Sequence, residues 1–256
     1  MLEAKGLFKY YGSVPAVRNV NFHIGPGQVL GYLGPNGSGK STTVKLLTGL
    51  LEPTRGQVLF SGKNIHDNLV SYRKRLGYVP EEANLYGYMT GEEYLAMVGT
   101  FREMPSHILR HRMNKLLELL SLAEHRHVPM SSYSKGMRQR ILLIAALMDD
   151  PEILILDEPL SGLDAVSSLV FRYLIQGLCL KGKAIFYCSH VLEVVEKVCT
   201  QLLILQKGEV IAHGSIDDVR RQIGQSTVED IFLQVVAEKD VSRIANDIVD
   251  VIIHTR

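Results

Sequence analysis

Residues 28–50 read QVLGYLGPNGSGKSTTVKLLTGL, and the interpretation of the whole chain starts from this stretch. The apolar run Gln28–Leu33 predicts a strand, and the apolar spacing of Ser41–Leu50 predicts a helix. Between them, residues 34–41 fit the pattern G-x-x-x-x-G-K-[ST]. Glycines let a backbone fold around an anion, and the following helix presents its positive end to that anion. The stretch therefore predicts a nucleoside triphosphate site, in which Lys40 reaches the outer phosphates and the Ser41 hydroxyl binds Mg²⁺.

A second candidate site segment is the apolar strand Ile153–Leu156, which ends in Asp157 and Glu158. Ligands of open α/β sheets bind at the carboxyl ends of the strands. We expect Asp157 to hold Mg²⁺, and Glu158 to act as general base on a water that attacks the γ-phosphate. The pair follows Lys40 by more than 110 residues, which is far for a simple P-loop GTPase or a small kinase.

The order of predicted elements favours a largely parallel α/β sheet. The first 60 residues are interpreted as short strands, with Val20, Phe22 and Ile24 on one face of one of them. Further strands are predicted at Gln57–Ser61, Ala184–Cys188 and Gln201–Leu205, with helices starting near residues 135, 165 and 191. Two helical stretches within residues 91–125 predict an inserted helical subdomain. We interpret residues 77–81 as a loop and Ser215 as the N-cap of a C-terminal helix.

Composition and charge exclude several classes of protein. The chain has 256 residues, 46% of them hydrophobic, and its 28 Lys and Arg against 27 Asp and Glu give a net charge of +1. This apolar content and low net charge exclude a disordered chain, and the chain lacks the excess of basic residues typical of nucleic-acid-binding domains. Cys179, Cys188 and Cys199 fit neither a disulfide framework nor a zinc site. We expect an intracellular protein, because no secretory signal is apparent and the longest apolar run, Ile141–Met148, is too short to span a bilayer.

The segment YSKGMRQR at residues 133–140 offers a Ser N-cap, a glycine and a basic helix. A hydroxyl and free backbone N–H groups at a helix N-terminus suit a phosphate. Taken alone this is a weak signal, because serine N-caps are common. Its position between the glycine-rich loop and the two carboxylates carries more information.

The ordered set of motifs resembles the ATP-binding cassette family, specifically the ATPase subunits of ABC transporters, over nearly the whole chain. GPNGSGKST at 34–42 is similar to the family's Walker A motif, YSKGMRQR at 133–140 to its signature, ILILDEP at 153–159 to Walker B, and SGLD at 161–164 to the D-loop. Ser189-His190 resembles the switch-histidine position. Tyr11 falls where the family stacks an aromatic side chain on adenine, and residues 229–232 resemble the closing helix.

The resemblance implies a fold and a division of the chain. We expect an α/β P-loop NTPase cassette with a mostly parallel core sheet, an N-terminal antiparallel β subdomain and an inserted α-helical subdomain. Its bounds would be residues 1–225 for the ATPase domain, with the insertion at about 87–150, and 226–256 for a short C-terminal extension.

The resemblance also implies a role for each candidate residue. The nucleotide-binding set is Tyr11, Gly34, Pro35, Asn36, Gly37, Ser38, Gly39, Lys40, Ser41 and Thr42. Mg²⁺ would be held by Ser41, Asp157 and Glu81; Glu158 and His190 would be catalytic. Two subunits of this family pair head to tail, so Ser134, Lys135, Gly136 and Met137 would contact ATP of the partner subunit, and Asp164 would link the two sites.

Two positions depart from the commonest family pattern. Glu81 stands where the family usually has glutamine, and our hypothesis is that its carboxylate binds Mg²⁺ in the closed state. Lys135 replaces the first glycine of the usual signature, as in a branch of prokaryotic exporter ATPases. Its cation would attract the opposing γ-phosphate, while solvation at the surface would oppose that gain.

The function implied is ATP hydrolysis that drives a separate membrane permease, with export favoured over import through the YSKGM and VPE variants. The subunit would sit on the cytoplasmic face of the membrane. It would dock through the helical insertion and the loop around Glu81, with residues 86–89 as a contact. Whether it pairs with itself or with a paralogue stays open, and so does its cargo. The alternatives are a non-transport ABC ATPase acting on DNA or ribosomes, which the compact single cassette and neutral charge disfavour, and a P-loop kinase, which has no use for a signature helix.

Overall fold

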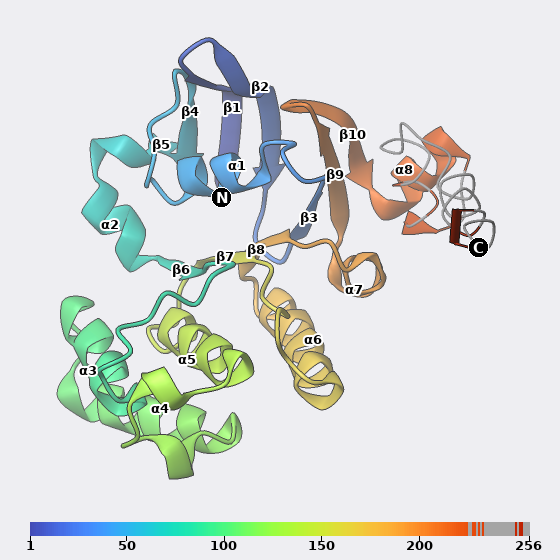
Figure 1. Cartoon of the computed structure of the whole chain (residues 1–256). Coiled ribbons are helices and arrows are strands. Elements are labelled where there is room, and N and C mark those ends of the chain that lie inside the picture. The colour runs from blue at the N-terminus through green and yellow to red at the C-terminus, as the bar shows by residue number, and fades with distance from the viewer. Residues whose placement is uncertain (225–226, 229, 231, 233–248, 250, 253–256) are drawn as a thin grey trace.

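The computed structural model describes residues 1–224, 227, 228, 230, 232, 249, 251 and 252. These residues form two β-sheets with helices around them (Figure 1). The antiparallel sheet lies at the top of that view. A group of three helices, α3 (Gly91–Phe101), α4 (Ser106–Leu119) and α5 (Lys135–Leu147), lies at the lower left.

The core sheet has the strand order β10-β9-β3-β8-β7-β6. Its strands are β3 (Val29–Leu33), β6 (Leu76–Val79), β7 (Ile153–Asp157), β8 (Ala184–Cys188), β9 (Gln201–Gln206) and β10 (Glu209–Ser215). All neighbouring pairs are parallel except β9 with β10. Every residue of β3, β7 and β8 is buried, as expected where helices or a second sheet cover both faces. The predicted mostly parallel sheet is confirmed.

The N-terminal sheet is antiparallel, with the order β2-β1-β4-β5. Its strands are β1 (Leu2–Tyr11), β2 (Val14–Ile24), β4 (Arg55–Phe60) and β5 (Lys63–Asn64). The predicted alternation holds in β2, where Val20, Phe22 and Ile24 are buried and share one core cluster with Tyr32 and Phe186 of the core sheet. The two sheets therefore close on a common apolar interior.

Helices α3 to α5 have an apolar core of their own. Leu95 of α3, Leu117 of α4 and Ile144 of α5 are fully buried in one cluster. Thr90 and Glu93 form a reciprocal capping box that starts α3. This group corresponds to the expected helical insertion, whose bounds stay a prediction. The 225/226 division also stays a prediction, and the closing helix at 229–232 falls largely outside the described residues.

The remaining helices flank the two sheets. They are α1 (Lys40–Leu47), α2 (Leu69–Lys74), α6 (Ala165–Leu180), α7 (Leu192–Val198) and α8 (Ile216–Ile223). Helix α1 ends before the predicted Leu50, because Gly49 adopts a left-handed φ of 68°. The N-cap predicted at Ser215 is present, since its side chain accepts a hydrogen bond from the Asp218 backbone N–H.

The interpretation of residues 77–81 as a loop is wrong in part. Leu76–Val79 forms strand β6, paired with β7, and only the residues from Pro80 onward leave the sheet. The pattern was missed because the strand is short and contains Gly77. A Cβ at that position would lie 2.5 Å from the Ala146 carbonyl oxygen, so the glycine allows α5 to pack closely on the strand.

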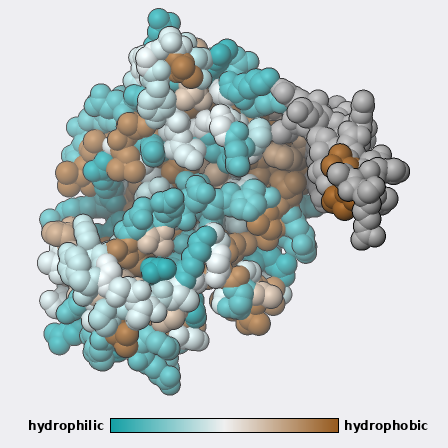
Figure 2. All heavy atoms as spheres, in the orientation of Figure 1, coloured by the Kyte–Doolittle hydropathy of each residue, from teal (hydrophilic) through white to brown (hydrophobic). Residues whose placement is uncertain are grey.

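The surface view in Figure 2 shows hydrophobic residues interspersed with hydrophilic ones. Among the described residues, none of the helices combines the length and apolar character needed to cross a membrane.

Candidate functional site

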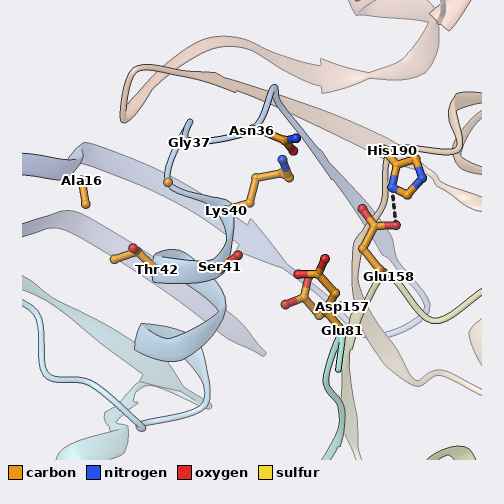
Figure 3. Close-up of a pocket in the computed structure, with 11 residues that line it drawn as sticks. Ala16, Asn36, Gly37, Lys40, Ser41, Thr42, Glu81, Asp157, Glu158 and His190 are labelled. Carbon is orange, nitrogen blue, oxygen red and sulfur yellow. Dashed lines mark ion pairs between the residues drawn. The ribbon is translucent and has the colours of Figure 1, made fainter. Parts of the chain in front are cut away.

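A pocket of about 580 Å³ lies between the glycine-rich loop and the carboxyl ends of β6, β7 and β8. Figure 3 shows the side chains that point into it. Its lining consists of Ala16, Asn36, Gly37, Gly39, Lys40, Ser41, Thr42, Glu81, Asp157, Glu158 and His190. Residues separated by more than 100 positions in sequence thus meet at one edge of the core sheet.

The glycine-rich loop passes closely over neighbouring backbone, and its shape requires glycine. Gly39 has a φ of 106°, and a Cβ there would lie 2.2 Å from the Ala16 carbonyl oxygen. A Cβ on Gly34 would lie 2.4 Å from the Leu205 carbonyl oxygen. Helix α1 begins directly after Gly39, and no side chain caps its N-terminus. Its first N–H groups are therefore available to an anion at the loop.

Lys40 is held at this loop by backbone carbonyls. Its Nζ donates hydrogen bonds to the carbonyl oxygens of Gly34 at 2.6 Å and Pro35 at 3.1 Å. The ammonium group thus stays beside the N-terminus of α1, where both the helix dipole and the lysine charge attract an anion.

Asp157 is a buried carboxyl beside two other acids. Only 5% of the residue is exposed, and its pKa is raised from 3.8 to about 6, mainly by burial. The charges of Glu81 and Glu158 also raise this pKa, while the Cys188 thiol and Lys40 lower it. An ionised Asp157 is therefore costly here unless a cation shares the site.

The chemistry of these donors fits Mg²⁺, which takes oxygen ligands. Magnesium usually binds through one or two carboxylates, with waters and substrate phosphates completing the set. Asp157 and Glu81 are two carboxylates that line this pocket, and the Ser41 hydroxyl lines it as well. No cluster of three or more His, Cys, Asp or Glu suited to a metal ion occurs in the described part of the chain.

Glu158 contacts His190 across the end of the sheet. The Nδ1 atom of His190 lies 2.8 Å from Oε2 of Glu158, as the dashed line in Figure 3 shows. The Glu158 side chain is 11% exposed and that of His190 is 75% exposed. Glu158 has a φ of 48°, a left-handed conformation that costs a non-glycine residue about 1–2 kcal/mol. Strain of this kind concentrates at functional sites, where the surrounding structure holds the residue in place.

Some candidate residues do not line the pocket. Gly34, Pro35 and Ser38 belong to the loop but are not among the lining residues; Ser38 is buried, and its hydroxyl has no hydrogen-bond partner among the described residues. Tyr11 ends β1, is 49% exposed and lies under the Lys9 ammonium, 5.9 Å from the ring centroid. Its predicted contact with a nucleotide base stays a prediction.

The signature and D-loop residues also lie outside this pocket, and they contact each other. Ser134 caps α5 and accepts a hydrogen bond from the Met137 N–H at 3.2 Å. A Cβ on Gly136 would lie 2.6 Å from the Gly162 carbonyl oxygen, so this glycine lets the two segments approach. Asp164 caps α6 through the Ser167 N–H. The capping role predicted for Ser134 is confirmed.

One lining residue, Ala16, was missed by sequence reasoning. It belongs to β2 and approaches the loop because the antiparallel sheet folds over α1. Alanine carries no chemical signal, and the contact arises from tertiary packing alone. No local pattern could have identified it.

Comparisons with known sequences find similarity to ABC transporter ATP-binding proteins. The family model described as ABC transporter matches residues 17–161. An uncharacterized ABC transporter ATP-binding protein of Nostoc sp., all4389, is 40% identical over 208 residues, which are 80% of this chain but only 62% of the length of that protein. The Nod factor export ATP-binding protein I of Ralstonia nicotianae is 34% identical over 230 residues, covering 90% of this chain and 72% of that one.

Solved structures agree with the sequence matches. A structure described as the ATP binding subunit of an ABC transporter superposes with a TM-score of 0.87 and 31% identity, over 92% of this chain and 99% of that one. A dimeric, post-hydrolysis state of the ATP-binding cassette MJ0796, bound to ADP and Pi, has a TM-score of 0.78 and 26% identity, over 84% and 99% of the two chains.

Proposed function

The chain belongs to the family of ABC transporter ATP-binding proteins, and from that premise we propose that it binds and hydrolyses ATP in the pocket of Lys40 and Glu158. The contact between Glu158 and His190 in this pocket carries the proposal, because a carboxylate base and an imidazole meet across from a phosphate loop. The relative MJ0796, in a state bound to ADP and Pi, supports hydrolysis as the reaction.

Binding of the triphosphate rests on the loop and on helix α1. The backbone N–H groups at the start of α1 and the Lys40 ammonium would neutralise the β- and γ-phosphates, and Asn36, Ser41 and Thr42 would add side-chain contacts. Tyr11 would stack on adenine from the end of β1. We propose that Ser41, Asp157 and Glu81 hold Mg²⁺, which supplies charge neutralisation for the phosphates.

Hydrolysis needs a base for the attacking water. The Glu158 carboxylate would take a proton from water as its oxygen attacks the γ-phosphorus, while the bond from that phosphorus to the bridging oxygen of ADP breaks. His190, in contact with Glu158, would orient the water and donate a hydrogen bond to the γ-phosphate. Lys40 would stabilise the charge on the phosphate oxygens.

We propose that a second subunit completes the site. Ser134, Lys135, Gly136 and Met137 lie at the N-terminus of α5, outside this chain's own pocket. A helix N-terminus with a polar cap attracts phosphate, so these residues would reach the γ-phosphate held by a partner subunit. Asp164 would connect the two sites. The dimeric form of MJ0796 supports this arrangement.

We further propose that the subunit works with an integral-membrane permease on the cytoplasmic face of the cell membrane, and that the transport is export. The name of one relative supports this direction, since it is a Nod factor export ATP-binding protein. The helical insertion and residues 86–89 would form the docking surface, where Tyr86 and Tyr88 are both exposed. A non-transport ABC ATPase is the less favoured alternative.

The test of hydrolysis uses Glu158→Gln. We expect the purified wild type to release phosphate from ATP in the presence of Mg²⁺. The variant should lose this activity and accumulate as an ATP-bound dimer, because the binding groups remain while the base is lost. Size-exclusion chromatography with and without ATP measures the dimer. Rapid turnover by the variant would contradict the assignment of the base.

The test of the permease uses the tagged chain in its native membrane. Co-purification with one polytopic membrane protein is expected. Removal of the exposed Tyr86 and Tyr88 side chains should weaken this association while leaving basal ATP hydrolysis intact. Recovery of ribosomal or nucleic acid partners in place of a permease would favour the alternative.

A further inference from the structure

Ser189 is a buried hydroxyl residue at the edge of the pocket, between strand β8 and His190. It is 1% exposed, whereas the His190 side chain beside it is 75% exposed. Ser189 does not line the pocket itself. The large majority of buried side-chain polar groups are hydrogen-bonded, and the partners of this one show what it holds in place.

The Ser189 hydroxyl lies between the Val191 backbone N–H and the Glu158 carboxylate. The Ser189 hydroxyl accepts a hydrogen bond from the Val191 backbone N–H at 3.1 Å. The hydroxyl in turn donates a hydrogen bond to Oε2 of Glu158, 3.3 Å away. The backbone is tied in the same direction, because the Glu158 N–H donates to the Cys188 carbonyl oxygen at 2.9 Å.

The two contacts on the Glu158 side chain reach the same oxygen. Ser189 and His190 both lie against Oε2, whereas no hydrogen bond among the described residues reaches Oε1. In Figure 3 the dashed contact ends on one carboxylate oxygen, and the second oxygen is turned towards the pocket. The carboxylate is thus held by one oxygen, with the other available to a water in the pocket.

We propose that Ser189 is a positioning residue for the base. It fixes Oε2 of Glu158, so that Oε1 faces the attacking water whether or not the exposed His190 side chain is in contact. The inference rests on the proposed function, since it assigns a role within the same hydrolysis. Ser189 does not line the pocket, so its loss should affect the chemical step and leave nucleotide binding intact.

The experiment compares Ser189→Ala with a matched control, Thr48→Ala. Thr48 is also buried, at 3% exposure, and its hydroxyl donates to the Val44 carbonyl oxygen at the far end of α1. Steady-state phosphate release gives kcat and KM for ATP, and a fluorescent ATP analogue gives Kd. We expect Ser189→Ala to lower kcat about 10-fold or more, with KM and Kd within about twofold of wild type.

Thr48→Ala should keep kcat within about twofold of wild type, because it removes a buried hydroxyl away from the base. Ser189→Thr, which retains the hydroxyl, should recover at least about half of the lost rate. The inference is overturned by a wild-type kcat in Ser189→Ala, by an equal loss in Thr48→Ala, or by Ser189→Thr being no faster than Ser189→Ala.

These outcomes are separable from a failure of the proposed function. A wild type without ATPase activity, or a Glu158→Gln variant that turns over normally, removes the proposed reaction itself. An active wild type and an inactive Glu158→Gln variant, combined with a normal Ser189→Ala variant, remove only the role of Ser189.

Discussion

Lys135 donates a hydrogen bond from Nζ to the Ser161 hydroxyl oxygen at 2.6 Å, and so joins the signature segment to the D-loop within one chain. Lys135 is exposed, and Ser161 is half-buried. The cation that replaces the usual signature glycine is therefore held at the surface that would face a partner subunit. Its charge and its hydrogen bond can be separated by substitution.

We predict that Lys135→Gln weakens ATP-dependent dimerisation in a salt-dependent way. Loss of one exposed charge opposite a phosphate should raise the ATP concentration for half-dimerisation about threefold at low salt. The difference should vanish at about 500 mM NaCl, where screening is strong. Size-exclusion chromatography in the Glu158→Gln background measures it. Ser161→Ala keeps the cation and should therefore keep the salt dependence. The prediction is contradicted if Lys135→Gln does not change the ATP concentration for half-dimerisation of the Glu158→Gln protein at low salt.

Lys40→Ala should remove nucleotide binding rather than turnover alone. The ammonium is held at the loop by the Gly34 and Pro35 carbonyls, so its loss takes away a fixed charge on the outer phosphates. We expect Kd for a fluorescent ATP analogue to rise at least ~100-fold, as for loss of charge-assisted hydrogen bonds. Lys45→Ala, an exposed lysine on the same helix, is the control and should bind normally. Equal affinities of Lys40→Ala and wild type would exclude this role.

Gly39→Ala tests the close passage of the loop over β2. The new Cβ would lie 2.2 Å from the Ala16 carbonyl oxygen at a φ of 106°, so backbone must move. We expect a loss of about 3 kcal/mol or more in the free energy of unfolding. Gly182→Ala has a φ of 81° with nothing within 4 Å, and should cost about 1–2 kcal/mol. Chemical denaturation gives both values, and similar costs would mean that the loop relaxes freely.

The particular successes and failures of sequence reasoning have physical causes. The bounds Ala184–Cys188 were predicted to the residue, because a run of five buried residues in a parallel strand has an unbroken apolar pattern. The site carboxylates and Lys40 were identified because their chemistry requires fixed residue types at fixed spacing. Strand β6 contains a glycine, which hid it from the pattern.

The features that could not be predicted from the sequence arise from tertiary packing. Ala16 reaches the pocket only because the second sheet folds over α1. Strand β10 was not predicted, since only one of its residues is buried and it lacks a continuous apolar run. The contact of Ser189 with Glu158 depends on the register of β7 against β8, where Asp157 pairs with Cys188. Register between distant strands is not encoded in any local stretch.

Asp157→Asn should stabilise the nucleotide-free protein, and more so at neutral than at acidic pH. The folded-state pKa of about 6 exceeds the ordinary 3.8, so ionised Asp157 destabilises the fold above pH 6. As pH falls from 6 to 4 the folded carboxyl takes up its proton first, and this penalty disappears. The full difference between these two pKa values corresponds to about 3 kcal/mol. This is the upper limit of the increase in the free energy of unfolding that Asp157→Asn should give at pH 7.5.

Thermal unfolding in EDTA at pH 7.5 and pH 5 measures this effect. The melting temperature of Asp157→Asn should exceed that of wild type by several degrees at pH 7.5, with a smaller excess at pH 5. Asp67→Asn, at an exposed carboxyl, should show no such difference. Mg²⁺ with ATP should raise the melting temperature of wild type but much less that of Asp157→Asn, because the metal ligand is lost. If Asp157→Asn is less stable than wild type at pH 7.5, the predicted direction of the change in stability is wrong.

Glu81 lines the same pocket, and its charge contributes to the raised pKa of Asp157. Removing this carboxylate therefore has two opposite consequences. Without metal, Glu81→Ala should stabilise the fold, since it relieves repulsion on Asp157. With ATP, it should raise the Mg²⁺ concentration for half-maximal hydrolysis about 10-fold, because one oxygen ligand is lost. Glu81→Gln keeps a ligating oxygen and should show a shift of about threefold.

The control is Glu82→Ala, which removes the neighbouring exposed carboxylate outside the pocket and should leave the Mg²⁺ titration unchanged. Loss of a metal ligand should give a more stable metal-free protein together with a weaker affinity for Mg²⁺. Loss of a residue that merely supports the loop would lower both the stability and the affinity for Mg²⁺. If Glu81→Ala leaves the Mg²⁺ dependence and the permease-coupled turnover unchanged, Glu81 is not a metal ligand, and the metal is held by Asp157 and Ser41 with the phosphates.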